Sequence, residues 1–150
     1  MSGIVVGVDG SEGARVALRF ALEEARMRGE KVRAVAAWHV PVAAYGGGAF
    51  VPPEPGLVER LGPEARGAVE RALSEAGDLA ADVEVETVVT EGPPARILLD
   101  EARDATMLVV SSRGLGGFRG LLLGSVSQQC SHHAPCPVVI VPHPRELRSD

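Results

Sequence analysis

The chain has 150 residues, of which 45% are hydrophobic and 23% charged, a size and balance that allow one globular domain to bury its own core. Its net charge of -5 argues against binding to nucleic acid or to an anionic membrane, because both repel an acidic protein. No apolar run reaches about 18 residues and no basic segment opens the chain, so we expect a cytoplasmic protein without a membrane span or signal peptide.

The first elements of the chain are a strand, a helix and a second strand. Residues 4–8 form an apolar, β-branched run, which is typical of a strand buried on both faces. Ser11 is placed to cap the following helix, which we expect to end at Gly29. A second apolar run at 32–38 predicts another buried strand. Residues 41–56 are rich in Gly and Pro, which predicts a long mobile loop with a functional role.

The rest of the chain continues this alternation. The predicted elements are a helix over 58–76, a strand over 83–89, a helix opened by Pro93 and Pro94, a strand over 106–110, a helix over 125–133 and a strand over 137–141. Strands that alternate with helices predict a parallel sheet with helices on both faces, and we expect residues 1–150 to form a single domain.

The strand ends suggest where a ligand binds. Ligands of parallel sheets lie beyond the carboxyl ends of the strands, at the point where the strand order reverses. Gly, Asp and Ser are most frequent after the first and the fourth predicted strands. If these two strands are neighbours, we expect their loops to face each other across a crevice.

A glycine-rich loop follows the fourth strand and indicates a phosphate site. Five glycines fall within eleven residues, namely Gly114, Gly116, Gly117, Gly120 and Gly124. Glycines let backbone N–H groups approach a phosphate, and Ser125 opens a helix whose first amides carry a partial positive charge. The alternative is a glycine-rich turn in which Ser125 only caps the helix. The loop has no lysine of the Walker type, and the chain has no dinucleotide fingerprint.

The spacing of Gly114, nine further residues and then Gly124-Ser125 resembles the ATP-binding motif of the universal stress protein family, G-x2-G-x9-G-[ST]. The segments GVDGSEGARVAL, EGPPARILLDEA, SSRGLGGFRGLLLGSV and HHAPCPVVIVP also resemble that family in order and spacing, so the resemblance covers essentially the whole chain. It implies a three-layer αβα fold, Rossmann-like and of the adenine nucleotide alpha hydrolase type, with a five-stranded parallel sheet of order 3-2-1-4-5.

The resemblance also implies a ligand and a partner. The ligand is ATP, or alternatively AMP or a cyclic nucleotide, with Mg²⁺ or Mn²⁺, and the partner is a second copy of the chain that pairs through the last strand. Asp9 would lie near the adenosine, and the backbone of Val40 would meet the adenine. The full candidate nucleotide site is Asp9, Val40, Ser111, Arg113, Gly114, Gly116, Gly117, Gly124, Ser125 and Val126. No catalytic residue and no protein ligand for a metal is expected.

Ser111 stands where the family motif has its first glycine. Its Cβ could crowd the ligand, or its hydroxyl could donate to a ribose or phosphate oxygen. Three functions therefore stay open. They are an ATP-binding stress-response or regulatory protein, a slow ATPase that lacks a loop lysine and a clear base, and a dimeric interaction module that has lost its nucleotide site. Cys130 is expected in the core, and Cys130 and Cys136 are both expected to be free thiols in a reducing compartment.

Overall fold

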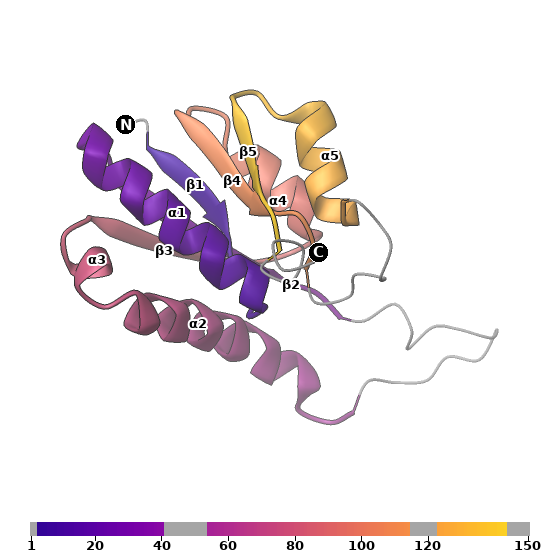
Figure 1. The fold of residues 1–150 in the computed structure, drawn as a ribbon. Helices are drawn as coiled ribbons and strands as arrows, with labels where there is room; N and C mark the ends of the chain where they lie inside the picture. The colour runs from indigo at the N-terminus through magenta and orange to yellow at the C-terminus, as the bar shows by residue number, and fades with distance from the viewer. Residues whose placement is uncertain (1–2, 41–53, 115–122, 144–150) are drawn as a thin grey trace, which may run out of the picture.

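The computed structural model describes residues 3–40, 54–114 and 123–143 (Figure 1). The strands are β1 (Ile4–Gly7), β2 (Val32–Trp38), β3 (Val85–Glu91), β4 (Met107–Ser111) and β5 (Val138–Val141). The helices are α1 (Glu12–Arg28), α2 (Leu57–Ala76), α3 (Asp78–Ala81), α4 (Pro94–Glu101) and α5 (Ser125–His133). Within these described ranges, no helix combines the length and the apolar composition needed to cross a membrane.

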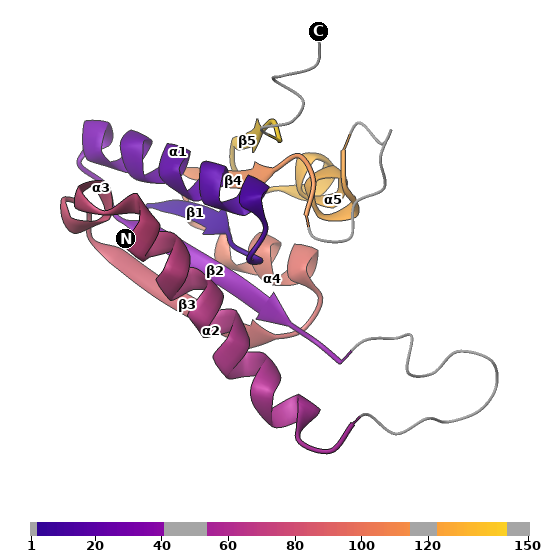
Figure 2. The same ribbon diagram turned by 60° about the horizontal axis from the view of Figure 1, so that its bottom comes forward.

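The strands form one parallel sheet in the order β3-β2-β1-β4-β5. β1 is central, since Ile4 lies beside Val32 of β2 on one side and beside Met107 of β4 on the other. Helices α1, α2 and α3 cover one face of the sheet, and α4 and α5 cover the other (Figure 1 and Figure 2). The αβα class and the strand order implied by the family resemblance are therefore confirmed.

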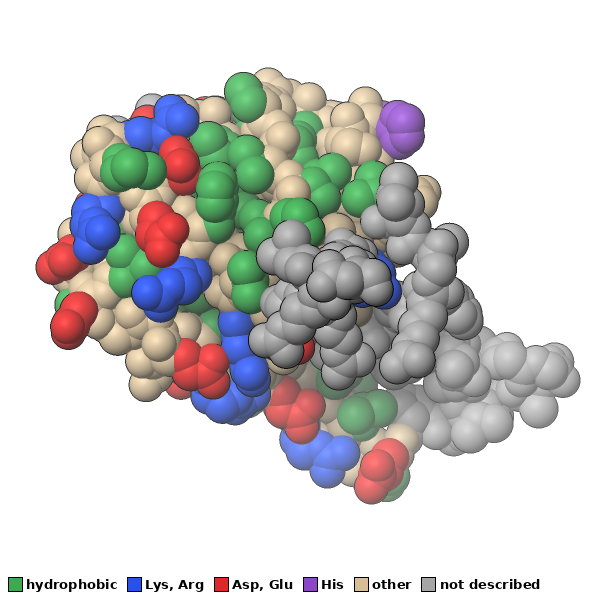
Figure 3. Space-filling model, viewed as in Figure 1, with side chains coloured by type: hydrophobic (Ala, Val, Ile, Leu, Met, Phe, Trp, Pro, Cys, Tyr) green, Lys and Arg blue, Asp and Glu red, His purple; other side chains and the backbone are tan. Residues whose placement is uncertain are grey.

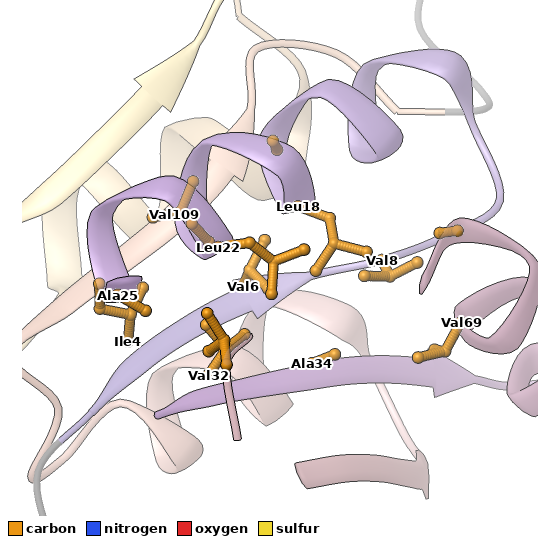
Figure 4. Packing of buried hydrophobic residues seen from close by; sticks show 14 of the residues in the cluster. Ile4, Val6, Val8, Leu18, Leu22, Ala25, Val32, Ala34, Val69 and Val109 are labelled. Atoms are coloured by element: carbon orange, nitrogen blue, oxygen red, sulfur yellow. The ribbon is translucent and has the colours of Figure 1, made fainter. Parts of the chain in front are cut away.

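Alternate residues of the central strand point into two hydrophobic clusters. Val5 belongs to the cluster beneath α4 and α5, whereas Ile4 and Val6 belong to the larger cluster beneath α1 and α2. Leu18 and Leu22 of α1 point onto β1 (Figure 4), and neither is more than 1% exposed. Because aromatic residues make up only 3% of the chain, aliphatic side chains such as these fill most of the core.

The region before β3 differs from the sequence prediction. β3 covers Val85–Glu91 rather than residues 83–89, because all seven of its residues pair in register with β2. The short helix α3 is not predicted, since four residues are too few to show a helical period. Leu79 of this helix and Val83 after it are buried in the larger cluster. Val83 is therefore a core residue, as its apolar character suggests, but not a strand residue.

Candidate nucleotide-binding site

The carboxyl ends of β1 and β4 open at the same edge of the sheet. The two strands are neighbours, with Val6 beside Val109, and the sheet order reverses here because β2 flanks β1 on its other side. The loops after these strands approach closely, since a Cβ built on Gly114 would lie 2.7 Å from Oδ2 of Asp9. The predicted meeting of the first and fourth strand exits is confirmed, at the place where open α/β sheets bind their ligands.

The turn after β1 presents Asp9 at this edge. The backbone N–H of Ser11 donates to Oδ1 of Asp9 at 2.9 Å, and the hydroxyl of Ser11 accepts from the N–H of Ala14 at 3.1 Å, as predicted for the cap of α1. Gly10, with φ +84°, makes the turn possible, because L side chains rarely adopt that conformation. Asp9 is exposed, and its carboxylate suits a ribose hydroxyl or a cation better than a bare phosphate.

The side chain of Ser111 lies between β4 and the first turn of α1. Its hydroxyl donates to the carbonyl oxygen of Arg113 at 2.9 Å. A Cβ built on Gly13 of α1 would overlap Oγ of Ser111, so the missing side chain at residue 13 provides the space that the serine occupies. The serine that replaces the motif's glycine is therefore accommodated by α1, and its hydroxyl bonds to the backbone at the start of the glycine-rich loop.

The two ends of the glycine-rich loop after β4 are joined through Ser112. The N–H of Gly124 donates to the carbonyl oxygen of Ser112 at 2.6 Å. Gly124 has φ −73°, so the backbone at this position does not require glycine. A Cβ there would meet the Ser112 oxygen at 3.4 Å and Cα of Arg113 at 3.5 Å, which is ordinary van der Waals contact. Among the described residues, neither the backbone angle nor a contact of the Cβ therefore requires glycine at this position.

Helix α5 begins directly after the loop and points its first amides at the same edge. The N-cap is Gly124, with no side-chain cap. Ser125 is the first helical residue and is exposed, so the alternative in which its hydroxyl caps the helix is wrong. Val126 packs its side chain against the smaller hydrophobic cluster, which leaves only its backbone to meet a ligand. Unpaired N–H groups and the helix dipole make such a helix start a site for anions.

Of the other residues predicted for the site, some lie near this edge and others lie outside the described residues. Arg113 is half-buried beside the loop, and half-buried Val40 follows β2, the strand next to β1. Gly116 and Gly117 lie outside the described residues, as does most of the predicted loop over 41–56. The structure thus brings Asp9, Ser111, Arg113, Gly114 and the start of α5 to one edge of the sheet.

The two cysteines belong to the core rather than to this edge. Both are free thiols, as predicted, and both pack in the smaller cluster. Burial, with a smaller contribution from nearby Cys136, raises the pKa of Cys130 to about 11. Burial also raises the pKa of Cys136. A thiol reacts as its thiolate, so these raised pKa values make both groups poor nucleophiles at neutral pH.

A cavity of about 470 Å³ lies at the opposite, amino edge of the sheet. Its wall includes Arg26 and Asp82, which pair at 3.8 Å, and Lys31, which pairs with Glu86 at 3.6 Å. This cavity is at the wrong ends of the strands for a ligand site of an open parallel sheet. Both of its cations, Arg26 and Lys31, are also paired with carboxylates, so we do not assign the nucleotide site to it.

Sequence reasoning missed two residues that shape the candidate site. Gly13 provides the space for Ser111, and Ser127 of α5 bonds to the strand exit at Ser112. The only sequence signal for Ser127 is a hydroxyl on the helix face that also carries Val126 and Cys130. Gly13 gives no sequence signal, because many helices have a glycine in the first turn that makes no close contact.

The sequence and the fold were compared with known proteins. The family model described as universal stress protein family matches residues 1–142. A universal stress protein of Mycolicibacterium smegmatis is 35% identical over 138 residues, covering 92% of this chain and 45% of the relative. The chain thus spans about half the length of such curated relatives.

Solved structures agree with the sequence comparison. UspA of Lactobacillus plantarum superimposes with a TM-score of 0.77 at 22% identity, over 93% of this chain and 97% of that one. A universal stress protein in complex with cAMP superimposes with a TM-score of 0.63 at 25% identity, over 95% of this chain and 97% of that one. The universal stress protein from Archaeoglobus fulgidus in complex with dAMP superimposes with a TM-score of 0.60 at 26% identity, over 94% of this chain and 98% of that one. By sequence over nearly its whole length, and by fold, the chain belongs to the universal stress protein family.

Proposed function

We propose that this universal stress protein binds an adenine nucleotide, with ATP as the first candidate, at the neighbouring exits of β1 and β4. The observation on which the proposal rests is the start of α5, where Gly124 and Ser125 follow a loop whose two ends are joined by the bond from Gly124 to Ser112. Backbone amides held in this way bind phosphate without any need for a basic side chain.

The chemistry of the surrounding groups fits the other parts of a nucleotide. Asp9 offers a carboxylate to a ribose hydroxyl, and we assign the base to the backbone at Val40, which follows β2. Arg113 adds positive charge next to the phosphates. A carboxylate beside several phosphates also favours a divalent cation, so we expect Mg²⁺ or Mn²⁺ to strengthen binding. The cAMP and dAMP complexes of two related proteins support an adenosine phosphate as the ligand class.

Isothermal titration with ATP and Mg²⁺ tests the proposal. We expect a dissociation constant from micromolar to sub-millimolar, and AMP, cAMP and GTP titrated in parallel rank the phosphate and base preferences. At a ligand concentration of about 100 times that constant, linkage gives about 2.7 kcal/mol of stabilisation and raises the unfolding midpoint by roughly 5–10 °C. No heat and no thermal shift at millimolar ATP would favour the ligand-free interaction module. Release of phosphate above background would instead favour the slow ATPase.

We further propose that the protein forms a homodimer through β5. In the described part of the chain β5 pairs only with β4, at the end of the sheet. Hydrophobic side chains gather between α1 and β5 on the face shown in Figure 3, where Val16, Phe20 and Val139 are half-buried. An unpaired strand beside apolar surface is a common site of association. Sedimentation velocity tests this: we expect a dimer whose dissociation is promoted by Val139→Lys, and a monomeric wild type at micromolar concentration would exclude it.

The biological role follows from the proposed ligand. Because the glycine-rich loop has no lysine and the sequence offers no clear base to activate water, we propose that the protein acts as a stress-response regulator with the nucleotide as its signal. We expect it in the cytoplasm, where the free thiols of Cys130 and Cys136 would be kept reduced. Cell fractionation tests the location, and mass spectrometry of ligand released from freshly purified protein identifies the nucleotide.

A further inference from the structure

Ser127 places a hydroxyl beneath the nucleotide loop. It lies on α5 and is 1% exposed. Its Oγ is 2.9 Å from the carbonyl oxygen of Ser112, at the exit of β4, and 3.0 Å from that of Gly124, at the end of the loop. A hydroxyl has one proton, so the two carbonyl oxygens share it. The side chain therefore joins the start of the loop to its end.

The bond to Ser112 distinguishes Ser127 from an ordinary helical serine. A serine in a helix often donates to the carbonyl three residues earlier, which accounts for the contact with Gly124 only. The Ser112 oxygen belongs to another element, fifteen residues away in the chain. It accepts from both the N–H of Gly124, at 2.6 Å, and the hydroxyl of Ser127, so both of its lone pairs hold the far end of the loop.

Ser112 is itself fixed to the sheet. It is 3% exposed, its N–H donates to the carbonyl oxygen of Val141 at 2.9 Å, and its hydroxyl accepts from the N–H of His143 at 3.0 Å. The start of α5 is thus tied through Ser112 to both β4 and the end of β5. The position of the first amides of α5 relative to Gly114 depends on these bonds.

We propose that Ser127 is a positioning residue of the nucleotide site. Its hydroxyl sets the distance between the two ends of the loop, so that Gly114 and the first amides of α5 meet the same phosphate chain. This inference rests on the proposed function, because it assigns the phosphates to those amides. Ser127 does not touch the nucleotide, since its hydroxyl is buried and directed at the two carbonyl groups.

The test compares two serines of the same helix. Ser131 also donates to the carbonyl three residues earlier, Gln128, at 2.8 Å, but it is exposed and has no bond to the strand. We expect Ser127→Ala to weaken binding of ATP with Mg²⁺ by about 3- to 10-fold, the equivalent of one neutral hydrogen bond, and Ser131→Ala to leave it within about twofold. Ser127→Thr, which keeps the hydroxyl, should recover most of the affinity.

Amide hydrogen exchange without nucleotide gives a second readout. We expect faster exchange at Gly124 in Ser127→Ala and no change in Ser131→Ala, with native circular dichroism in both. If wild type binds ATP and Ser127→Ala binds equally well, or if exchange at Gly124 is unchanged, the positioning role is overturned while the proposed function stands. If wild type binds no ATP, the proposed function fails and the inference fails with it.

Discussion

The two edges of the parallel sheet differ in how their polar groups are satisfied. At the amino edge, charged side chains pair with one another. Arg33 donates to Glu86 at 3.4 Å and to the carboxylate of Glu101 at 3.1 Å, and Glu30 accepts from the hydroxyl of Thr106 at 2.9 Å. Most of these groups are satisfied within the protein, although Oε2 of Glu30 is buried without a hydrogen-bond partner among the described residues.

At the carboxyl edge, small side chains bond to the backbone instead. The hydroxyl of Ser11 caps α1, that of Ser111 holds Arg113, and that of Ser127 holds Ser112. These bonds hold the turns at the exits of β1 and β4. The difference teaches that the charged side chains of one edge pair within the fold, whereas the edge with serines and glycines is the one to which we assign the ligand. The predictions below test this division of roles.

The largest effect is expected from filling the space at the start of α5. Gly124→Val should weaken ATP binding by at least about 100-fold, close to 2.7 kcal/mol, because the branched side chain would occupy the space that the phosphate needs. The fold should persist, since φ is negative there, with a loss of about 1 kcal/mol because valine is a poor N-cap. Titration and circular dichroism measure both effects.

A valine placed in another helix controls for the substitution itself. At Gly67 of α2, a Cβ would meet only the end of the Arg71 side chain. Gly67→Val should therefore leave ATP affinity unchanged. Equal affinity in Gly124→Val and wild type would mean that the carboxyl edge at α5 is not the phosphate site.

The next effect concerns the fit of Ser111 against Gly13. Gly13→Ala should destabilise the protein by about 1–3 kcal/mol, because the added Cβ overlaps Oγ of Ser111. In a Ser111→Gly background the same change should cost less, because the overlap with Ser111 is gone and alanine is the better helix former, while the approach of the added Cβ to the carbonyl oxygen of Arg113 at 3.2 Å remains. Urea unfolding of the four proteins measures the coupling, and additive effects would show that the two residues do not touch.

Ser111→Gly alone should change ATP affinity by less than about tenfold, or 1.4 kcal/mol, in either direction. Its hydroxyl bonds to the loop backbone, so its removal loosens the loop without removing a contact that we assign to the ligand. Titration of the two proteins under one metal condition checks this. A wild type that fails to bind beside a variant that binds tightly would mean that the serine closes the site.

A substitution at the amino edge should have a smaller effect, and only on the free energy of unfolding. Arg33→Gln should lower the free energy of unfolding by about 1 kcal/mol, because partly exposed ion pairs contribute modestly. ATP affinity should stay within about twofold of wild type. A large loss of affinity would contradict the separation of roles between the two edges.

The smallest effect is a spectroscopic one. Trp38 ends β2 at the carboxyl edge, and its indole packs near Gly62 of α2, where a Cβ would lie 3.4 Å from Nε1. We expect a modest change in its emission when nucleotide binds near Val40. A flat signal at saturating nucleotide, with saturation established by calorimetry, would place the base away from the end of β2.

The periodicity of the apolar residues predicted most of the helices and strands, but not which strands are neighbours in the sheet. The buried strands and the stripe of α1 follow from their apolar residues, whereas the strand order came from the family resemblance, because no local pattern encodes which strands are neighbours. The bounds of β3 are set by the seven residues that pair with β2, so the prediction that it begins at residue 83 was wrong. The helix α3 is too short to produce a pattern.

The sequence predicted which loop and helix start form the candidate site, but not the contacts that hold them in position. Glycine spacing located the loop and the start of α5, since the chemistry of phosphate binding requires those residue types. The hydroxyl of Ser111 and the role of Ser127 depend on neighbours in space, Gly13 and Ser112, that are far away in the chain. Such contacts become visible only when the strands and helices are brought together.

Amide hydrogen exchange with and without ATP and Mg²⁺ compares both edges in one measurement. The account predicts slower exchange with nucleotide around residues 9–11, 111–114 and 124–127, at the exits of β1 and β4 and the start of α5. It predicts no change around residues 25–33 and 82–86, at the amino edge. Protection confined to the amino edge, or no protection at saturating ATP, would contradict the claim that the carboxyl edge is the nucleotide site.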